Sequence, residues 1–199
     1  MKIITSLRIT SIPERKEIRD SVDQNLLSIL IDSNIYPILI PNSFGLYRNS
    51  KKLIRYLDKI KPNGLLLTGG EDFPKNRLRF NLEKFLFNFF IKKNLPIFGI
   101  CRGMQMIGIL NGVNLKKTKL KVKKKYFLRN GNYKASAKCY FRWELDSIPK
   151  NYEKTFTSQN GTVWGIKHNN LRCEGVMFHP ERENSIKTKK YISKFFKRQ

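Results

Sequence analysis

The sequence is poor in acidic residues, cysteine and histidine, and each shortage limits the partners or the kinds of site that the protein can have. It holds 15 Asp or Glu residues against 40 Lys or Arg, which gives a formal net charge of +25. A charge of this sign favours nucleic acid, an anionic membrane surface or anionic substrates as partners. The alternative is compositional drift, because Lys, Asn and Ile are all used heavily and net charge does not determine a fold.

The sequence also lacks a cysteine framework and a long apolar run. Three cysteines, Cys101, Cys139 and Cys173, have spacings that match neither a set of disulfides nor a zinc site. We therefore expect a reducing cytoplasm, and no metal or cofactor. No uncharged apolar run approaches the roughly 20 residues of a transmembrane helix. The N-terminus reaches Arg8 too early for a signal peptide, so no membrane span is expected.

The 199 residues suit a single domain, 1–199, with a substantial core. Short apolar runs predict strands at 2–7, 36–41, 64–70, 95–100, 162–167 and 174–178. Longer amphipathic runs predict helices at 20–33, 51–60, 78–93, 104–110 and 185–196. Between them, a Lys-rich region, 113–154, shows a weaker pattern. Strands that are apolar throughout and separated by helices predict an α/β fold, with an open, mostly parallel sheet and helices on both faces.

The segment GICRG, residues 99–103, places Cys101 between two glycines, where a predicted strand passes into a predicted helix. This is the pattern of a nucleophile elbow, whose sharp turn leaves no room for side chains beside the nucleophile. The start of the helix favours a thiolate, and the backbone N–H of Arg102 would face a developing oxyanion. The alternative is an inert buried cysteine in a tight turn.

A cysteine nucleophile needs a base, and the sequence offers two histidines. In GVMFHPERE, residues 175–183, His179 follows a predicted buried strand. Pro180 would hold an extended segment in which His179 and Glu181 lie on the same side. Glu181 would then select the imidazole tautomer that accepts the thiol proton. His168 lies in a polar turn and is interpreted as a solvated loop residue.

A second glycine pair, Gly69 and Gly70 in LLLTGGED, follows another predicted strand. Ligands of open parallel sheets bind beyond the carboxyl ends of the strands, which is where this pair falls. Its backbone N–H groups could supply a second oxyanion donor beside Cys101. The alternative is a plain tight turn.

Together, GICRGMQMI, LLLTGGEDF and GVMFHPERE resemble the motifs of the class I glutamine amidotransferase superfamily. Within it, the chain is most similar to stand-alone gamma-glutamyl hydrolases of the gamma-glutamyl-GABA hydrolase type. The segment ERKEIRDSVDQNLLSIL is more loosely similar to gamma-glutamyl-CDP-amidate hydrolases, which act on nucleotide intermediates in bacterial surface-sugar pathways. The resemblance covers most of residues 1–112 and 155–184, and it implies a flavodoxin-like fold.

The resemblance implies a complete cysteine hydrolase site. Cys101 would be the nucleophile, His179 the general base and then acid, and Glu181 the residue that orients the histidine. The substrate would be glutamine or another gamma-glutamyl amide, attacked at its side-chain carbonyl. The oxyanion would rest on the N–H groups of Gly70 and Arg102, and water would then cleave the glutamyl thioester.

The resemblance also implies substrate-binding residues. Gln105 would face the substrate one helical turn after the nucleophile, although it could also be a helix-surface residue. Gly69 would line the same pocket, and Arg102 would pair either with the substrate carboxylate or with a structural partner. Family members usually carry an Asn-Ser-x-His-type segment that helps to bind substrate. The corresponding segment here, ASAKCYFRW at 135–143, has no histidine.

Three functions follow from these patterns. The first is hydrolysis of a gamma-glutamyl amide to glutamate and an amine. The second is a glutaminase subunit that supplies ammonia to a partner synthase. The third is a degenerate member that binds an anionic ligand or single-stranded nucleic acid, because basic and aromatic residues interleave over 116–143. A solvated basic face beside ordinary core aromatics is the interpretation we favour for that region, and nucleic acid is the least favoured partner.

Overall fold

The computed structural model describes residues 1–46, 51–72, 76–131, 133–182 and 186–198. Among these residues a central sheet has seven strands, in the order β11-β13-β14-β6-β5-β1-β4. Five of them run parallel: β4 (Tyr36–Ile40), β1 (Lys2–Ser6), β5 (Gly64–Leu67), β6 (Ile97–Ile100) and β14 (Cys173–Val176). Two antiparallel strands complete one edge: β13 (Gly165–His168) and β11 (Tyr152–Lys154). The predicted mostly parallel sheet is confirmed.

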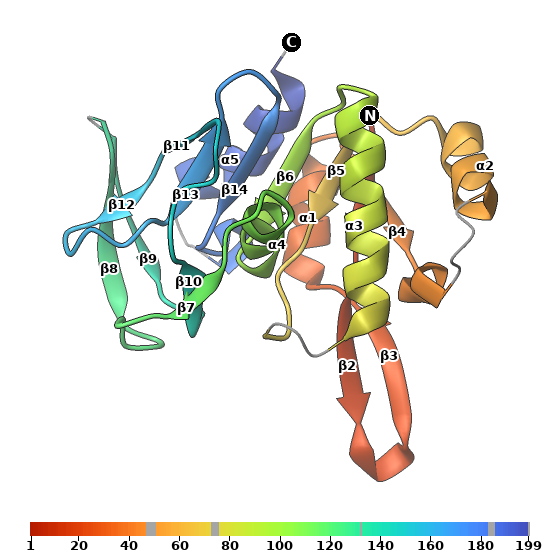
Figure 1. The fold of residues 1–199 in the computed structure, drawn as a ribbon, viewed down its shortest axis with the longest axis horizontal. Helices are drawn as coiled ribbons and strands as arrows, with labels where there is room; N and C mark the ends of the chain where they lie inside the picture. The colour runs from red at the N-terminus through yellow and green to blue at the C-terminus, as the bar shows by residue number, and fades with distance from the viewer. Residues whose placement is uncertain (47–50, 73–75, 132, 183–185, 199) are drawn as a thin grey trace.

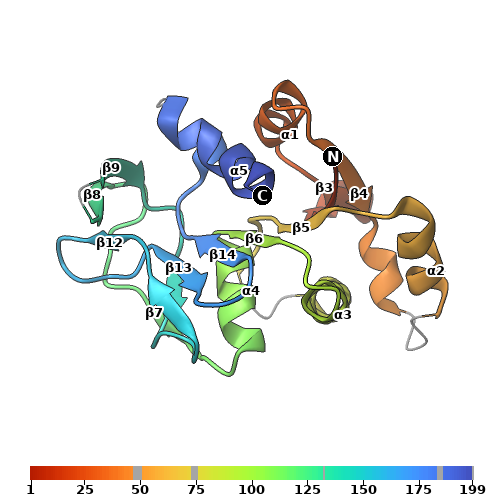
Figure 2. The same cartoon turned by 90° about the horizontal axis from the view of Figure 1, so that it is seen from above.

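Helices cover both faces of this sheet, as predicted. They are α1 (Gln24–Asp32), α2 (Lys51–Ile60), α3 (Arg77–Lys92), α4 (Arg102–Leu110) and α5 (Ile186–Lys197). Figure 2 shows α1 and α5 on one face and α3 and α4 on the other, with α2 beyond the β4 edge. Strands β5 and β6 are buried at every position, because both of their faces are covered. Ser185, the first residue of the predicted last helix, lies outside the described residues.

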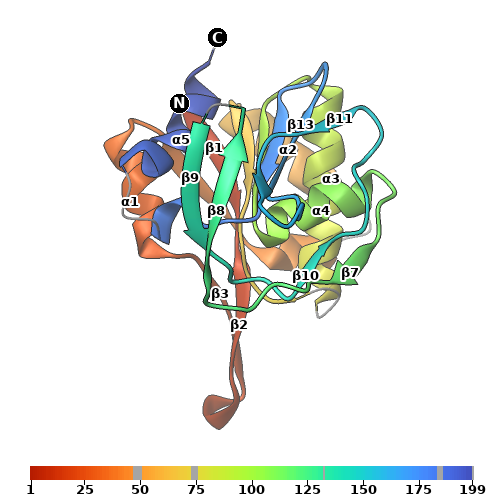
Figure 3. The same cartoon turned by 90° about the vertical axis from the view of Figure 1, so that its left-hand side faces the viewer.

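The prediction of a helix over 20–33 is wrong at its start. The helix begins at Gln24, where the Asp23 side chain accepts a hydrogen bond from the Asn25 N–H at 3.0 Å. The residues before it form a hairpin of β2 (Arg8–Ile12) and β3 (Glu17–Ser21), which projects from the body of the molecule (Figures 1 and 3). An exposed hairpin buries no apolar face, so its sequence lacks the alternation that would have revealed it.

The Lys-rich region folds into small antiparallel sheets at the β11 edge (Figure 1). One pairs β7 (Leu115–Lys117) with β10 (Trp143–Leu145), and the other contains β8 (Lys125–Asn130), β9 (Tyr133–Lys138) and β12 (Thr157–Ser158). The lysines of this region are exposed, and so is the Phe127 ring of β8, whereas two other aromatic rings turn inward. Tyr126 and Phe141 pack on buried Trp164, with ring centroids 5.9 and 5.0 Å away. For Tyr126 and Phe141, this packing favours a core role over base stacking.

No helix among the described residues combines the length and the apolar character needed to cross a bilayer.

Candidate active site

Cys101 lies at the junction of β6 and α4, in a backbone conformation that few residues adopt. Its φ is 51° and its ψ is −105°, and its N–H donates to the Val176 carbonyl at 2.7 Å. A positive φ at a residue other than glycine costs about 1–3 kcal/mol, and such residues cluster at functional sites. Cys101 is 7% exposed, at the carboxyl end of a central parallel strand. This is the strained turn that a nucleophile elbow requires.

The two glycines of the elbow allow a close backbone approach. A Cβ on Gly99 would lie 2.6 Å from the carbonyl carbon of Gly103. A Cβ on Gly103 would overlap the carbonyl oxygen of Leu67 and lie 2.7 Å from its carbonyl carbon. The start of α4 therefore packs directly on the backbones of β5 and β6, as the sequence pattern predicts.

His179 and Glu181 lie together behind β14. The His179 Nδ1 is 2.6 Å from the Glu181 Oε1, and both residues are buried. The expectation of an extended segment is wrong, because Pro180 opens a short 3-10 turn, Pro180–Arg182. This turn still brings the two side chains into contact. The His179 ring also packs against the second glycine segment, since its Cε1 lies 2.7 Å from where a Cβ on Gly69 would be.

The pKa of His179 is raised to about 9. Burial by itself would lower this pKa, but charge and hydrogen bonding from Cys101, and then from Glu181, outweigh the burial. The raised pKa favours the protonated imidazole, which lies between the Cys101 sulfur and the Glu181 carboxylate. The structure thus brings the three residues proposed for catalysis into one hydrogen-bonded line.

Gly69 and Gly70 lie just after the end of β5, and Gly69 lies against the His179 ring. A Cβ on Gly70 would overlap the Arg79 guanidinium and lie 2.8 Å from the Arg8 Cβ, so only glycine fits there. This close packing against Arg79 and Arg8 favours a specific role for the glycine pair over a plain tight turn. The oxyanion role of the Gly70 and Arg102 N–H groups stays a prediction.

The structure distinguishes between the two roles expected for the Arg102 side chain, and it shows that Gln105 is buried. The Arg102 guanidinium is buried in an ion pair with Glu83, and its Nε lies 3.8 Å from the Glu71 Oε1. This pairing favours a structural role for the side chain over a substrate carboxylate contact. Gln105 is 4% exposed and its Nε2 donates to the Trp143 carbonyl at 2.7 Å, so it is not a helix-surface residue.

Two residues near His179 were missed by the sequence analysis. The Tyr140 ring meets the His179 ring edge-on, with centroids 5.6 Å apart. The Arg182 guanidinium lies 5.2 Å above the Tyr140 ring, and its Nε is 3.5 Å from the Asp23 Oδ2. Tyr140 belongs to the segment noted for lacking a histidine and for its interleaved basic and aromatic residues. For Arg182, its position directly after His179-Pro180-Glu181 was the feature of the sequence that could have indicated a place near the site.

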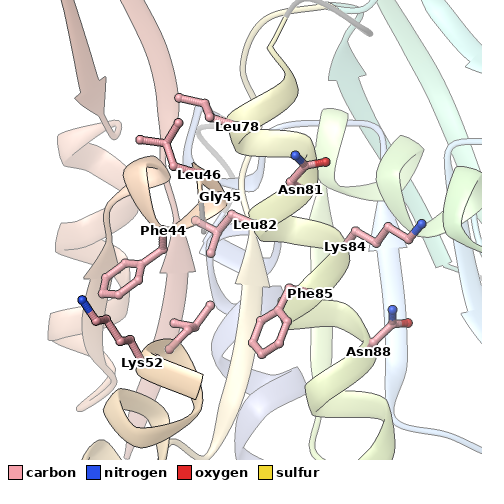
Figure 4. Close-up of a pocket in the computed structure, with 11 residues that line it drawn as sticks. Phe44, Gly45, Leu46, Lys52, Leu78, Asn81, Leu82, Lys84, Phe85 and Asn88 are labelled. Carbon is pink, nitrogen blue, oxygen red and sulfur yellow. The ribbon is translucent and has the colours of Figure 1, made fainter. Parts of the chain in front are cut away.

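Cavity size is a poor guide to this site. The pocket that His179 and Glu181 line has a volume of 20 Å³, close to the space of one water molecule. A pocket of 580 Å³ lies instead between α2, α3 and the 3-10 turn Asn42–Leu46, and its described lining includes neither Cys101 nor His179. Figure 4 shows Phe44 on one side of it and Leu82 and Phe85 of α3 on the other. The chemistry of the residues, not the volume, identifies the site.

In the described part of the chain, no group of three or more His, Cys, Asp or Glu side chains is arranged to hold a metal ion.

Known proteins resemble this chain in sequence and in fold. The carbamoyl phosphate synthase small chain of Buchnera aphidicola subsp. Acyrthosiphon pisum is 25% identical over 187 residues, which cover 88% of this chain and 44% of that protein. A glutamine-hydrolyzing GMP synthase subunit of Methanosphaera stadtmanae is 24% identical over 174 residues, covering 74% of this chain and 90% of that protein. The chain spans less than half the length of the carbamoyl phosphate synthase small chains that it matches.

Among solved structures, a Thermoplasma acidophilum protein assigned to GMP synthase superposes with a TM-score of 0.74 at 19% identity, covering 98% of this chain and 92% of that one. A glutamine amidotransferase from Thermotoga maritima superposes with a TM-score of 0.65 at 15% identity, covering 90% and 76%. These two similarities establish the fold alone.

The named sequence relatives are parts of synthases, so they support the superfamily and not the narrower resemblance to gamma-glutamyl hydrolases. The family model for glutamine amidotransferase class-I matches residues 16–199 of the chain. That span includes the Cys101 elbow, the Gly69–Gly70 segment and the His179–Glu181 pair. The chain belongs to the class-I glutamine amidotransferase family.

Proposed function

We propose that the chain, acting as a single glutamine amidotransferase unit over 1–199, hydrolyses the side-chain amide of glutamine and supplies ammonia to a partner synthase. The observation that carries this proposal is the hydrogen-bonded line of Cys101, His179 and Glu181 at the end of a parallel strand. The similarity to a glutamine-hydrolyzing part of a synthase supports the choice of substrate and partner. The three cysteines are free thiols, which supports a reducing cytoplasm.

The proposed reaction has two halves. The Cys101 thiol gives its proton to His179, its sulfur attacks the side-chain carbonyl of glutamine, and the oxyanion forms against the N–H groups of Gly70 and Arg102. The protonated His179 donates to the leaving nitrogen, so ammonia departs and a glutamyl thioester remains on Cys101. The neutral His179 then takes a proton from water, which attacks the thioester and releases glutamate. Glu181 holds the His179 ring in place throughout.

A second candidate is hydrolysis of a larger gamma-glutamyl amide without any synthase. The feature that favours it is the motif GICRGMQMI, which resembles the nucleophile motif of stand-alone gamma-glutamyl hydrolases. The two candidates share the nucleophile and the base, and they differ in the amine that leaves.

Glutamate release by the purified chain, from glutamine and from gamma-glutamyl-GABA, separates the two candidates. We expect glutamine to be the better substrate by at least about tenfold in kcat/KM, which corresponds to about 1.4 kcal/mol of transition-state discrimination. The reverse order would contradict the glutaminase proposal and favour the hydrolase. The Cys101→Ala variant supplies the background rate for both substrates.

The rate of glutamine hydrolysis should fall as the pH rises through about 9, because His179 then loses the proton that the leaving ammonia needs. Glu181→Gln removes a carboxylate that raises the pKa of His179, so this alkaline limb should move to lower pH. The same change should cost less activity than His179→Ala, since an orienting residue is less essential than the base. The pH profile of kcat/KM checks both statements.

The exposed carboxylate of β11, Glu153, provides the control, and Glu153→Gln should leave the profile unchanged. An alkaline limb that stays in place in Glu181→Gln would show that another group controls it.

A further inference from the structure

Four charged side chains, three of them buried and one partly exposed, form a cluster beside the elbow: Glu71, Arg79, Glu83 and Arg102. Arg79 and Glu83 are fully buried, and Arg102 is nearly so. The Arg79 Nε lies 2.8 Å from the Glu83 Oε1, and its Nη1 lies 2.9 Å from the Glu71 Oε2. Two positive and two negative groups are therefore paired, as buried charges must be. Such a cluster holds its members at fixed separations.

Arg79 also binds the backbone of the second glycine segment. Its Nη2 donates to the Thr68 carbonyl at 2.7 Å and to the Gly69 carbonyl at 3.1 Å. Its guanidinium occupies the place that a side chain on Gly70 would need. One planar group thus contacts three successive residues of the segment that follows β5.

Glu83 links Arg79 to the elbow, because its carboxylate binds both Arg79 and Arg102. Its Oε2 accepts a hydrogen bond from the Arg102 Nη1, and Arg102 directly follows Cys101 at the start of α4. Its Oε1 accepts from the Ser6 hydroxyl at 2.9 Å, and the same hydroxyl accepts from the Thr68 N–H at 3.0 Å. Helix α3, which lies beside α4 in Figure 2, therefore joins two segments that touch different parts of the site.

We propose that Arg79 is a positioning residue, which with Glu83 fixes the Gly69–Gly70 segment relative to the Cys101 elbow and so aligns the two oxyanion donors. The donors come from separate segments, and an oxyanion hole works only when its donors are placed before the charge develops. The rigid five-donor fork of arginine suits this task, whereas lysine offers one mobile ammonium. The inference rests on the proposed function of Cys101 and of the Gly70 and Arg102 N–H groups.

Two reagents that react at Cys101 separate oxyanion alignment from thiolate reactivity. Acylation by p-nitrophenyl acetate passes through a tetrahedral oxyanion, whereas alkylation by iodoacetamide does not. In Arg79→Lys, we expect acylation of Cys101 to slow by about tenfold to a hundredfold, as for a misplacement of about 1 Å. Alkylation should stay within about twofold of the wild-type rate. Both rates are followed by mass mapping of the Cys101 peptide.

Arg77→Lys, the same change at an exposed position of α3, is the matched control and should alter neither rate. Circular dichroism establishes whether each variant is folded. If Arg79→Lys does not fold, Glu71→Gln decides the question, because this partly exposed carboxylate also binds the Arg79 guanidinium. It should slow acylation by at least about threefold and leave alkylation unchanged.

The inference is overturned if acylation in the folded variant stays within about twofold of wild type, or if both rates fall in parallel. It is also overturned if the wild-type chain is acylated no faster than Cys101→Ala. Neither reagent carries a glutamyl group, so these rates do not depend on which amide the protein hydrolyses. A wild-type chain that is acylated normally but releases no glutamate from glutamine would contradict the proposed function and leave the positioning role standing.

Discussion

Cys101→Ala is expected to lower glutamine hydrolysis by about 10⁴-fold or more while the fold stays intact. The change removes the nucleophile that forms the glutamyl thioester, and the oxyanion donors can then assist only the slow direct attack of water on the amide. Alanine adopts the φ of 51° at the elbow with the same strain as cysteine, and the site loses one small, nearly buried group. The kcat for glutamine and the thermal unfolding midpoint check the two halves of this prediction.

The matched control for this variant is Cys173→Ala. Cys173 is buried at the start of β14, paired with Ile97 at the opposite end of β6 from the elbow. Its removal should cost stability through lost packing and leave kcat within about threefold of wild type. If Cys101→Ala retained activity within about tenfold of wild type, the assignment of the nucleophile would be wrong.

Gly103→Ala is expected to destabilise the protein by about 3 kcal/mol, the upper end of what overpacking a core costs. The added methyl group would overlap the carbonyl oxygen of Leu67, the last residue of β5, whose strand lies between β1 and β6. Glycine to alanine in a helix normally stabilises by up to about 1 kcal/mol, so the sign of the change is itself diagnostic. Urea unfolding followed by circular dichroism gives the free energy.

Gly112→Ala isolates the effect of backbone conformation from that of the clash. Gly112 has a φ of +82°, and a Cβ there would meet no atom within 4 Å. Its replacement should cost about 1–2 kcal/mol from the left-handed conformation alone. A Gly103→Ala variant as stable as wild type would mean that α4 does not pack on the β5 backbone as closely as the structure has it.

The parts of the fold that the sequence predicts are those with a strong local signal. The strands β5 and β6 carry no polar side chain and are buried at every position, since helices cover both faces of the sheet. The hairpin of β2 and β3 was missed because its position depends on contacts from elsewhere in the chain. Asn42 donates to the Asp20 carboxylate from its backbone and its side chain, at 2.9 and 2.7 Å. No pattern within residues 8–21 carries that information.

The elbow and the His-Pro-Glu segment could be predicted from adjacent residues, because each is a short pattern in which the backbone turn and the reactive side chain are neighbours. Glycines beside Cys101 predict a sharp turn for a steric reason that holds in any fold. The partner of the Arg102 side chain could not be predicted in this way. Glu83 is 19 residues away, on another helix, and only the packing of α3 beside α4 brings its carboxylate to the guanidinium. An ion pair forms only when its two charged groups lie close together. For residues on separate helices, that proximity depends on how the helices pack, which only the tertiary structure determines.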